Sequence, residues 1–377
     1  MGVSKRIALL AVIGLLAAFE FAAAQQGPGG RTSEPVARPR TKGQPAEAEA
    51  PPIPSKYGRK EQPPLPEGLP TFRADVTTVT VDVAVLDNRG NFIPGIPGGN
   101  FLVLEDKVPQ RITGFSMGEA PMTVCMVIEW SGLWQSYWSE TWYQTLTAAY
   151  GFLETLKPED YVAVVAYDLR PEILSDFATD KRKAYEAMQR LRIAAYSESN
   201  LYDALVDTAE RMADIEGRKA IVLISSGVDT FSKLNFGEAR RRLQMAGVPI
   251  YAIGLMQALR EWADARGYLD SISRLDFLQA DNQLRTFANE TGGMAFFPRF
   301  YGEFPAIFAS ISQALRNQYS LTYQPTNQAK DGKFRKIEVA LVDPKTGEKL
   351  RIVDQKGKPI RYRILAKAGY TAPREVE

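Results

Sequence analysis

The middle of this chain alternates short apolar runs with stretches of helical periodicity. The apolar runs lie at 124–130, 161–168, 219–226, 248–256 and 294–300, and the helical stretches at 134–156, 181–192, 201–214, 237–246, 282–291 and 304–317. Continuous apolar strands that alternate with amphipathic helices are typical of a parallel sheet covered by helices on both faces. The sequence therefore predicts a doubly wound α/β domain with a mostly parallel sheet at residues 121–318.

The two flanks of this region have the periodicity of antiparallel strands. Apolar and polar residues alternate at 75–91 and 101–115, and the same alternation returns at 318–325, 334–343, 349–353 and 360–365. Such segments are typical of half-buried strands joined by turns. Because an α/β domain often has its two ends close together, we expect it to be inserted in a β-sandwich-like module formed by residues 71–120 and 319–373.

Residues 1–24 have the order of a secretory signal peptide. Lys5 and Arg6 precede an apolar run from Ile7 to Phe19, and three alanines precede Gln25. The run is shorter than the roughly 20 residues that a membrane span needs, and no cysteine near the cleavage site could carry a lipid. We expect an exported protein, periplasmic or extracellular, whose mature chain does not insert into the membrane; a retained N-terminal anchor is the alternative.

Residues 25–70 are rich in proline, glycine and charge and nearly lack large apolar side chains. Such a segment cannot bury enough surface to offset the entropy of ordering it. We expect a disordered tether that acts as a spacer; a binding site for a proline-recognising partner is the alternative.

Charge and residue usage limit the possible functions. The 46 basic residues nearly balance the 44 acidic ones, so no net field favours nucleic acid or an anionic membrane surface. The chain has no histidine, which removes the commonest general base and most catalytic zinc sites. Its one cysteine, Cys125, lies in an apolar run where a thiol is usually inert. We predict that the protein is not an enzyme; a pair of catalytic carboxylates is the alternative.

Three segments follow or precede the apolar runs at the edge where an α/β sheet binds ligands. They are 129-EWSGL-133, 197-SESNLYDAL-205 and 225-SSGVDTFS-232. Because the carboxyl ends of parallel strands meet in one crevice, we expect these segments to form a common site. With the strand-rich lead at 72–91 and the endings 333-KFRKIEVAL-341 and 369-GYTAP-373, the chain resembles a Rossmann-like von Willebrand factor A (VWA) domain, and in particular the acidobacterial-type VWFA-related proteins.

The resemblance implies a metal-ion-dependent adhesion site. In that family an Asp-x-Ser-x-Ser run, a Thr and a second Asp hold a divalent ion, to which a partner adds an acidic group. In this sequence Glu129 takes the position of the first Asp, Ser131 matches the first Ser, and Leu133 takes the position of the second Ser. A leucine supplies neither charge nor a lone pair to a hard cation.

The remaining positions of that site are also altered. Ser199 takes the position of the Thr and keeps its hydroxyl, whereas Ser226 takes the position of the second Asp and loses the charge. Asp229, three residues later, could supply a replacement carboxylate. We predict a degenerate site with no cofactor; binding of Mg²⁺ or Mn²⁺ by the remaining groups is the alternative.

Two sets of residues are candidates for contact with a partner. In 129-EWSGLWQSYWSETW-142 the four-residue spacing continues into Leu146 and Leu153, which predicts a buried helix face. The first part of this segment lies at the tip of the strand, and we predict that it contacts a partner through Trp130, Leu133 and Trp134. The insertion at 257–283 carries the interface-enriched residues Arg260, Trp262 and Arg266; a packed helical excursion is the alternative.

The leading hypothesis is an exported, non-enzymatic protein-interaction module of adhesion or scaffold type. It would bind an extracytoplasmic protein at the carboxyl edge of the sheet without an obligatory metal ion. One alternative is metal-dependent adhesion through Glu129, Ser131, Ser199 and Asp229. A second is a structural component of the cell envelope whose β module pairs edge to edge with its neighbours.

Overall fold

The computed structural model describes residues 78–118, 120–131, 146, 149–191, 196, 198–267, 271–353 and 356–374. The chain divides into two compact units, residues 1–47 and 48–377, and every described residue lies in the second. The signal peptide and the tether predicted at 1–24 and 25–70 therefore lie outside the described residues.

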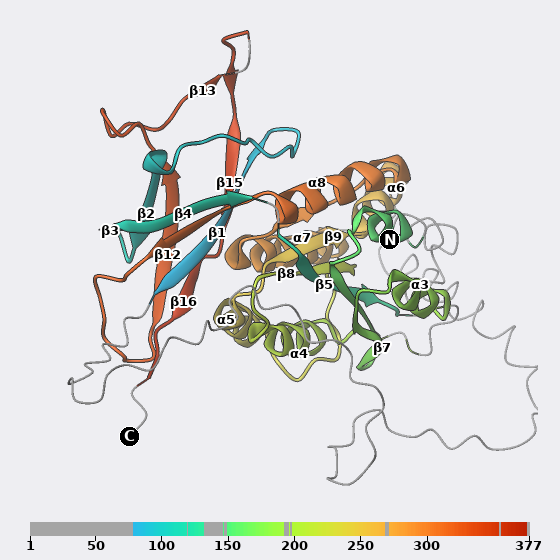
Figure 1. Cartoon of the computed structure of the whole chain (residues 1–377). Helices are drawn as coiled ribbons and strands as arrows, with labels where there is room; N and C mark the ends of the chain where they lie inside the picture. Colours follow the sequence, from blue (N-terminus) through green and yellow to red (C-terminus); the bar gives the residue numbers. More distant parts are fainter. Residues whose placement is uncertain are drawn as a thin grey trace, which may run out of the picture. The chain divides into compact units, whose positions relative to one another are not determined.

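A six-stranded sheet forms the centre of the α/β domain (Figure 1). In spatial order its strands are β10 (Met294–Phe296), β9 (Ile250–Gly254), β8 (Arg218–Ser225), β5 (Met122–Glu129), β6 (Tyr161–Tyr167) and β7 (Pro171–Ala178). All neighbouring strands pair in parallel except β6 and β7. Every residue of β5 is buried, as expected for a central strand covered on both faces.

Helices cover both faces of this sheet. They are α3 (Lys181–Gln189), α4 (Leu201–Ala213), α5 (Phe236–Ala246), α6 (Met256–Ala265), α7 (Ser271–Thr291) and α8 (Phe304–Arg316), with the short 3-10 helix η2 (Tyr301–Glu303) before α8. Helices α3 and α8 pack with Met126 of β5 in one apolar cluster, and α4, α5 and α7 pack with Val127 in another. The doubly wound fold is thus confirmed.

The described part of the predicted tryptophan-rich stripe is core. Leu146, Ala149, Leu153 and Leu156 are buried in the same cluster as α3 and α8. Trp138 and Trp142, which precede them at the same spacing, lie outside the described residues.

Two elements differ from the sequence-based prediction. Strand β7 was not expected, because its half-exposed position at the edge of the sheet leaves no continuous apolar run to mark it. Helix α7 begins at Ser271 rather than near residue 282; among the described side chains of its first half, Leu275 and Leu278 are exposed, so the apolar pattern does not mark the start of the helix.

The flanks form two four-stranded antiparallel sheets. One has the order β15 (Tyr362–Ala366), β1 (Val79–Asp87), β11 (Gln318–Tyr323) and β4 (Ile112–Gly118). The other has the order β16 (Gly369–Thr371), β12 (Phe334–Leu341), β2 (Phe101–Glu105) and β3 (Val108–Gln110). A small hairpin joins β13 (Ile352–Val353) to β14 (Pro359–Ile360), and η1 (Gly98–Asn100) precedes β2.

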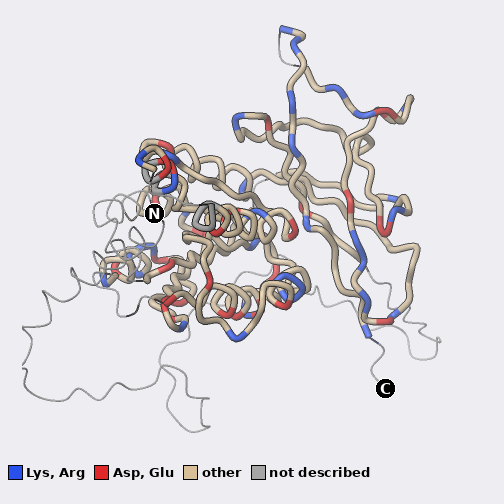
Figure 2. Tube along the Cα trace, turned by 180° about the vertical axis from the view of Figure 1, so that it is seen from behind, with Lys and Arg blue, Asp and Glu red and all other residues tan. Residues whose placement is uncertain are grey.

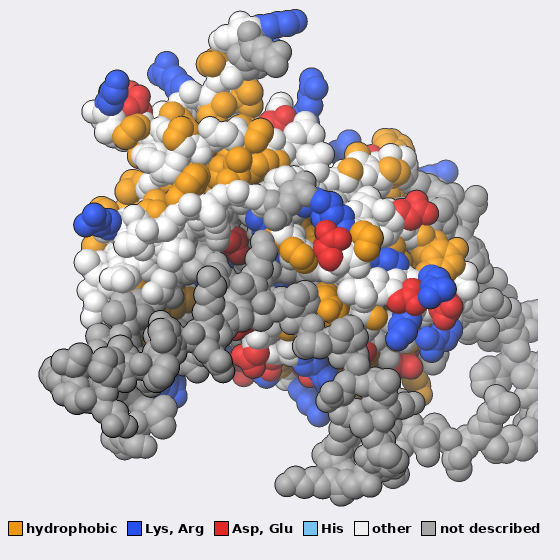
Figure 3. Space-filling model, in the orientation of Figure 1, with side chains coloured by type: hydrophobic (Ala, Val, Ile, Leu, Met, Phe, Trp, Pro, Cys, Tyr) orange, Lys and Arg blue, Asp and Glu red, His pale blue; other side chains and the backbone are white. Residues whose placement is uncertain are grey.

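Apolar residues of both sheets share one core, with Val81, Val103 and Tyr319 among its members, so the flanks form a β-sandwich. In the view of Figure 3, apolar side chains also gather on the surface of this β module. Exposed members on β3 and β4 include Val108, Phe115 and Met117.

Strand β1 joins the β module to the α/β domain because both faces of its second half are buried. Val81, Val83 and Val85 belong to the sandwich core, whereas Ala84 and Leu86 belong to the α/β core on the side of α8. Alternate residues of a strand point to opposite faces, so one strand serves two cores. Among the described helices, none combines the length and apolar character required to cross a membrane.

Candidate functional site

The carboxylate of Glu129, at the end of β5, is the centre of the predicted site. Its Oε2 atom accepts hydrogen bonds from the Ser226 backbone N–H at 2.7 Å, the Ser226 hydroxyl at 2.8 Å and the Ser225 hydroxyl at 3.0 Å. Its Oε1 atom accepts one from the Ser131 hydroxyl at 3.0 Å. Glu129 is only 1% exposed, so these groups take the place of water around the carboxylate.

Tyr167, at the end of the neighbouring strand β6, extends the network. Its hydroxyl donates to Ser225 Oγ at 2.8 Å, and Ser225 Oγ also accepts the backbone N–H of Gly227 at 2.9 Å. Burial raises the pKa of Glu129 although its hydrogen bonds act in the opposite direction. Burial likewise raises the pKa of Tyr167, helped by the nearby carboxylate. The ends of β5, β6 and β8 are therefore linked through one buried acid.

Ser199 lies just before α4, at the carboxyl edge of the sheet. Its backbone N–H donates to the Thr230 hydroxyl, and its carbonyl accepts the backbone N–H groups of Thr230 and Phe231 at 2.8 and 3.1 Å. Its own hydroxyl is buried and makes no hydrogen bond in the described structure. Ser199 therefore ties the segment before α4 to the loop after β8 through its backbone, while its hydroxyl is enclosed.

The carboxylate of Asp229 forms its hydrogen bonds with the start of α4 and with Ser232. Its Oδ1 atom accepts the backbone N–H of Tyr202 at 3.2 Å and the hydroxyl of Ser232 at 2.5 Å. Tyr202 lies in the first turn of α4, where backbone N–H groups lack partners within the helix. Burial raises the pKa of Asp229. Asp229 therefore stabilises the start of α4, and the idea that it replaces the missing carboxylate gains no support.

The donor set fits a divalent cation poorly. Mg²⁺ and Mn²⁺ prefer several oxygen ligands with formal negative charge. No group of three or more acidic, histidine or cysteine side chains that could hold a metal converges within the described part of the chain. The one central carboxylate, Glu129, already accepts four hydrogen bonds from serine groups. A metal ion would have to displace these donors without a second carboxylate to help.

Comparison with protein families identifies the α/β region. A family model for the von Willebrand factor type A domain matches residues 135–308. The chain contains a VWA domain. The matched residues begin after Glu129 and Ser131 and include Ser199, Ser226 and Asp229. A search of curated proteins found no match to this sequence.

Several solved structures resemble the VWA domain at low sequence identity. Proximal thread matrix protein 1 from the mussel byssus matches 56% of this chain and 51% of its own, with 13% identity and a TM-score of 0.42. This chain thus spans about half of that protein. The vWF domain of the type V pili tip protein Mfa5 from Porphyromonas gingivalis matches 52% of this chain and 95% of its own, with 15% identity and a TM-score of 0.40. A von Willebrand factor type A protein from Catenulispora acidiphila matches 80% of this chain and 76% of its own, with 10% identity and a TM-score of 0.40.

Trp130 is not placed as the sequence predicted. It is 8% exposed and belongs to the core cluster on the side of α3 and α8, and its backbone N–H donates to the Tyr167 carbonyl at 2.6 Å. This burial does not favour contact of Trp130 with a partner, and the predicted contact gains no support from its position. The other two candidates of that segment, Leu133 and Trp134, lie outside the described residues.

Arg260 of the α6 insertion is held inside the VWA domain. Its guanidinium makes an ion pair with Asp281 of α7 at 2.9 Å, and Asp281 is buried. Arg260 thus fixes α6 against α7 instead of being available to a partner. Arg266 is exposed after the end of α6, and Trp262 lies within α6 but its side chain is outside the described residues.

Two exposed aromatic residues beside Ser199 were missed by the sequence analysis. Tyr196 is 50% exposed, and Phe231, whose backbone N–H donates to the Ser199 carbonyl, is 56% exposed. Phe300, beyond the carboxyl end of β10, is also exposed. Neither Tyr196 nor Phe231 belongs to a periodic apolar pattern. The sequence signal that could have identified them is a single large aromatic residue within an otherwise polar loop.

Proposed function

We propose that this protein is an exported, non-enzymatic protein-interaction module of adhesion or scaffold type. Its VWA domain binds an extracytoplasmic protein at the carboxyl edge of the sheet, beside Ser199. The site is a degenerate metal-ion-dependent adhesion site of an acidobacterial-type VWFA-related protein, and it functions without an obligatory ion. The mature chain is periplasmic or extracellular, as its N-terminal sequence suggests.

The observation that carries this proposal is the exposure of Phe231, on the loop after β8, and of Tyr196, on the segment before α4. Aromatic side chains that lose their exposed surface on binding dominate many protein interfaces. Two exposed aromatic side chains near the carboxyl edge of the sheet suit a polypeptide surface as the partner.

The hydrogen bonds around Glu129 support a site that needs no metal ion. In a metal-dependent adhesion site, the ion compensates the charges of the acids that hold it. In this chain, serine groups from three positions already stabilise the single buried carboxylate. A structure of the mussel thread matrix protein has zinc in its metal-ion-dependent adhesion site (MIDAS) motif. Metal-dependent adhesion is therefore the alternative to test.

Charge distribution and residue usage support a protein as the partner. Basic and acidic residues are interspersed along the described trace (Figure 2), which does not favour a polyanionic ligand. The absence of histidine from the sequence removes the general base that most hydrolases and transferases use.

Affinity capture with the mature chain, residues 25–377, tests this function. The chain is immobilised, incubated with envelope extract in EDTA or in Mg²⁺, and compared with Phe231→Asp and with Tyr196→Asp. We expect the same captured protein in both buffers and a large loss with either variant. Phe334→Asp, which changes an exposed phenylalanine of the β module, is the matched control and should capture as the unmodified chain does.

Three results would contradict the proposal. Capture that survives in the combined Phe231→Asp and Tyr196→Asp variant would exclude this crevice as the binding site. Capture that disappears only in EDTA would favour metal-dependent adhesion. If the chain captures no protein and instead associates with itself through the β module, the structural alternative is favoured.

A further inference from the structure

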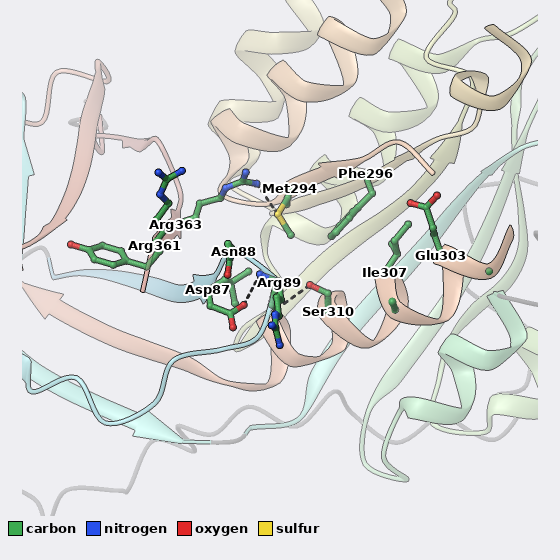
Figure 4. A pocket seen from close by; sticks show the side chains of 15 residues that line it. Asp87, Asn88, Arg89, Met294, Phe296, Glu303, Ile307, Ser310, Arg361 and Arg363 are labelled. Carbon is green, nitrogen blue, oxygen red and sulfur yellow. Dashed lines mark hydrogen bonds between the residues drawn. The ribbon is translucent and has the colours of Figure 1, made fainter. Parts of the chain in front are cut away.

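A second cavity lies where the β module meets the VWA domain. It has a volume of about 590 Å³ and is lined by the end of β1 and its turn, the start of β15, strand β10 and helix α8 (Figure 4). This volume is in the range of sites that bind small molecules or short peptide segments. Its lining includes neither Glu129 nor Ser199 nor Phe231, so it is separate from the crevice described above.

The floor of the cavity is apolar. Leu86 of β1, Met294 of β10 and Ile307 of α8 are buried in the core of the α/β domain, and half-buried Phe296 packs against them. These side chains come from both modules, so the floor exists only because β1 packs on α8. Such a surface favours an apolar side chain of a ligand.

The rim of the cavity carries three arginines, Arg89, Arg361 and Arg363. Among the described residues none of them makes an ion pair. The side-chain partner of Arg363 is the sulfur of Met294, at 3.0 Å from Nη1 (Figure 4). A thioether is a weak acceptor for a guanidinium, whereas a carboxylate is a strong one.

Neither acid of the rim forms an ion pair with Arg361 or Arg363 among the described residues, although Asp87 interacts electrostatically with Arg89. Asp87 accepts the backbone N–H groups of Arg89 and Asn91 and the side-chain amide of Asn91, so it stabilises its own turn. Glu303 accepts the backbone N–H groups of Arg299 and Phe300 before α8. The cavity therefore offers guanidinium donors above an apolar floor.

We propose that this cavity binds a peptide segment of a partner protein in which an acidic side chain lies beside an aliphatic one. The aliphatic side chain occupies the floor between Met294 and Ile307, and the carboxylate pairs with Arg361 and Arg363. Arg361 immediately precedes β15 and Arg363 is its second residue, and both line the same cavity.

The position of β10 favours a peptide over a free carboxylate. Strand β10 is the last strand of the VWA sheet and, in the described structure, pairs only with β9. The outer edge of such a strand can pair with the backbone of an added peptide. A peptide along this edge would have its side chains between the arginines and α8. This proposal does not depend on the function proposed for the crevice.

Fluorescence anisotropy with the mature chain tests the proposal. The probe is a labelled hexapeptide of alternating glutamate and isoleucine, and the comparison peptide has glutamine in place of each glutamate. We expect the glutamine peptide to bind at least about tenfold more weakly, as the loss of charged hydrogen bonds predicts. We expect a similar loss for the acidic peptide in the combined Arg361→Gln and Arg363→Gln variant.

Arg351→Gln removes an exposed arginine of the β module that does not line the cavity, and it should leave the affinity unchanged. Equal affinity for the two peptides, undetectable binding of the acidic one, or full binding by the double variant would overturn the proposal. Octanoate provides a further test. If octanoate binds through Arg361 and Arg363 and neither peptide binds, the ligand is a small carboxylate and the proposal is overturned. Phe231→Asp should not affect peptide binding, so the two sites can fail independently.

Discussion

The backbone amide of Ser226 donates a hydrogen bond of 2.7 Å to the carboxylate of Glu129. The resemblance to metal-dependent VWA domains would put an acid at both positions, and two buried acids repel each other unless a cation lies between them. With a serine at position 226, the second position becomes a donor to the first. The pair Glu129 and Ser226 can therefore hold the ends of β5 and β8 together by hydrogen bonds alone.

Replacement of Glu129 tests how much this network stabilises the VWA domain. Glu129→Ala leaves the buried groups of Ser225 and Ser226 without their acceptor, and we expect a loss of about 3 kcal/mol in the free energy of unfolding. Glu129→Gln keeps one carbonyl oxygen for the Ser226 amide and should lose less. Urea denaturation followed by circular dichroism measures both. Glu172→Ala, at an exposed acid of β7, is the control, and an equal loss in it would refute the assignment.

The stability of the protein should also depend on pH through Glu129. Burial raises the pKa of its carboxyl above the ordinary value of 4.5, so the folded state holds the proton more tightly than the unfolded state. The resulting stabilisation is complete below 4.5 and is lost as the pH rises through the folded-state pKa. Glu129→Gln should therefore show a smaller decrease in stability than the unmodified protein as the pH rises from 4.5 towards neutrality.

This comparison separates Glu129 from other acids. Burial raises the pKa values of Asp229 and Asp281 in the same direction, but both acids are present in each of the two proteins. Their contribution therefore cancels in the difference. Identical pH profiles of the two proteins would mean that Glu129 does not titrate differently in the folded and unfolded states.

Removal of divalent ions should leave the stability unchanged. An ion that binds only the folded state raises the free energy of unfolding by about 2.7 kcal/mol when its concentration is a hundred times its dissociation constant. We expect the same melting temperature in EDTA and in millimolar Mg²⁺ or Mn²⁺. An increase of several degrees with either metal, abolished by Ser199→Ala, would instead support a residual metal site.

The strands of the VWA sheet could be predicted because burial on both faces leaves a continuous apolar run. All seven residues of β6 and all eight of β5 are buried, and both strands lie within a few residues of their predicted positions. The β module could be predicted from alternation, because strands such as β2 bury every second residue in the sandwich core. Strand β7 could not, because an edge strand with one exposed face needs few apolar residues.

The positions of the site residues could be predicted, but their interactions could not. Glu129 and Ser226 follow neighbouring parallel strands, so the sequence already brings them to one edge. The four hydrogen bonds from serine groups to the Glu129 carboxylate depend on side-chain rotamers. The periodicity of a sequence carries no information about rotamers. The burial of Trp130 was missed for a similar reason, since its side chain packs in the core cluster although it lies just beyond the end of the apolar strand.

An internal ion pair at the opposite edge of the sheet should contribute strongly to stability. The carboxylate of Asp160 is fully buried, and it pairs with Arg316 of α8 at 3.0 Å. It also accepts the backbone N–H of Met122 at the start of β5. Arg316→Met leaves this buried charge without its cation, and we expect a loss of about 3 kcal/mol in the free energy of unfolding.

The exposed pair Arg242 and Glu210 provides the control for that variant. Nη2 of Arg242 lies 2.6 Å from Oε2 of Glu210, but both side chains are 44% exposed. Arg242→Met should therefore change the stability by less than about 1 kcal/mol. If the two arginine variants unfold at the same urea concentration, burial does not distinguish the two ion pairs.

Two glycine variants should change the stability in opposite directions. A Cβ atom at Gly293, just before β10, would lie 2.0 Å from the carbonyl oxygen of Ile250 in β9. Gly293→Ala must therefore push β10 away from β9, and we expect a loss of more than about 2 kcal/mol. Gly151 lies in a helical segment, and its Cβ would meet no atom within 4 Å, so Gly151→Ala should stabilise by about 0.5–1 kcal/mol. Thermal and urea denaturation measure both, and a Gly293→Ala protein as stable as the unmodified chain would show that β9 and β10 are not packed as closely as described.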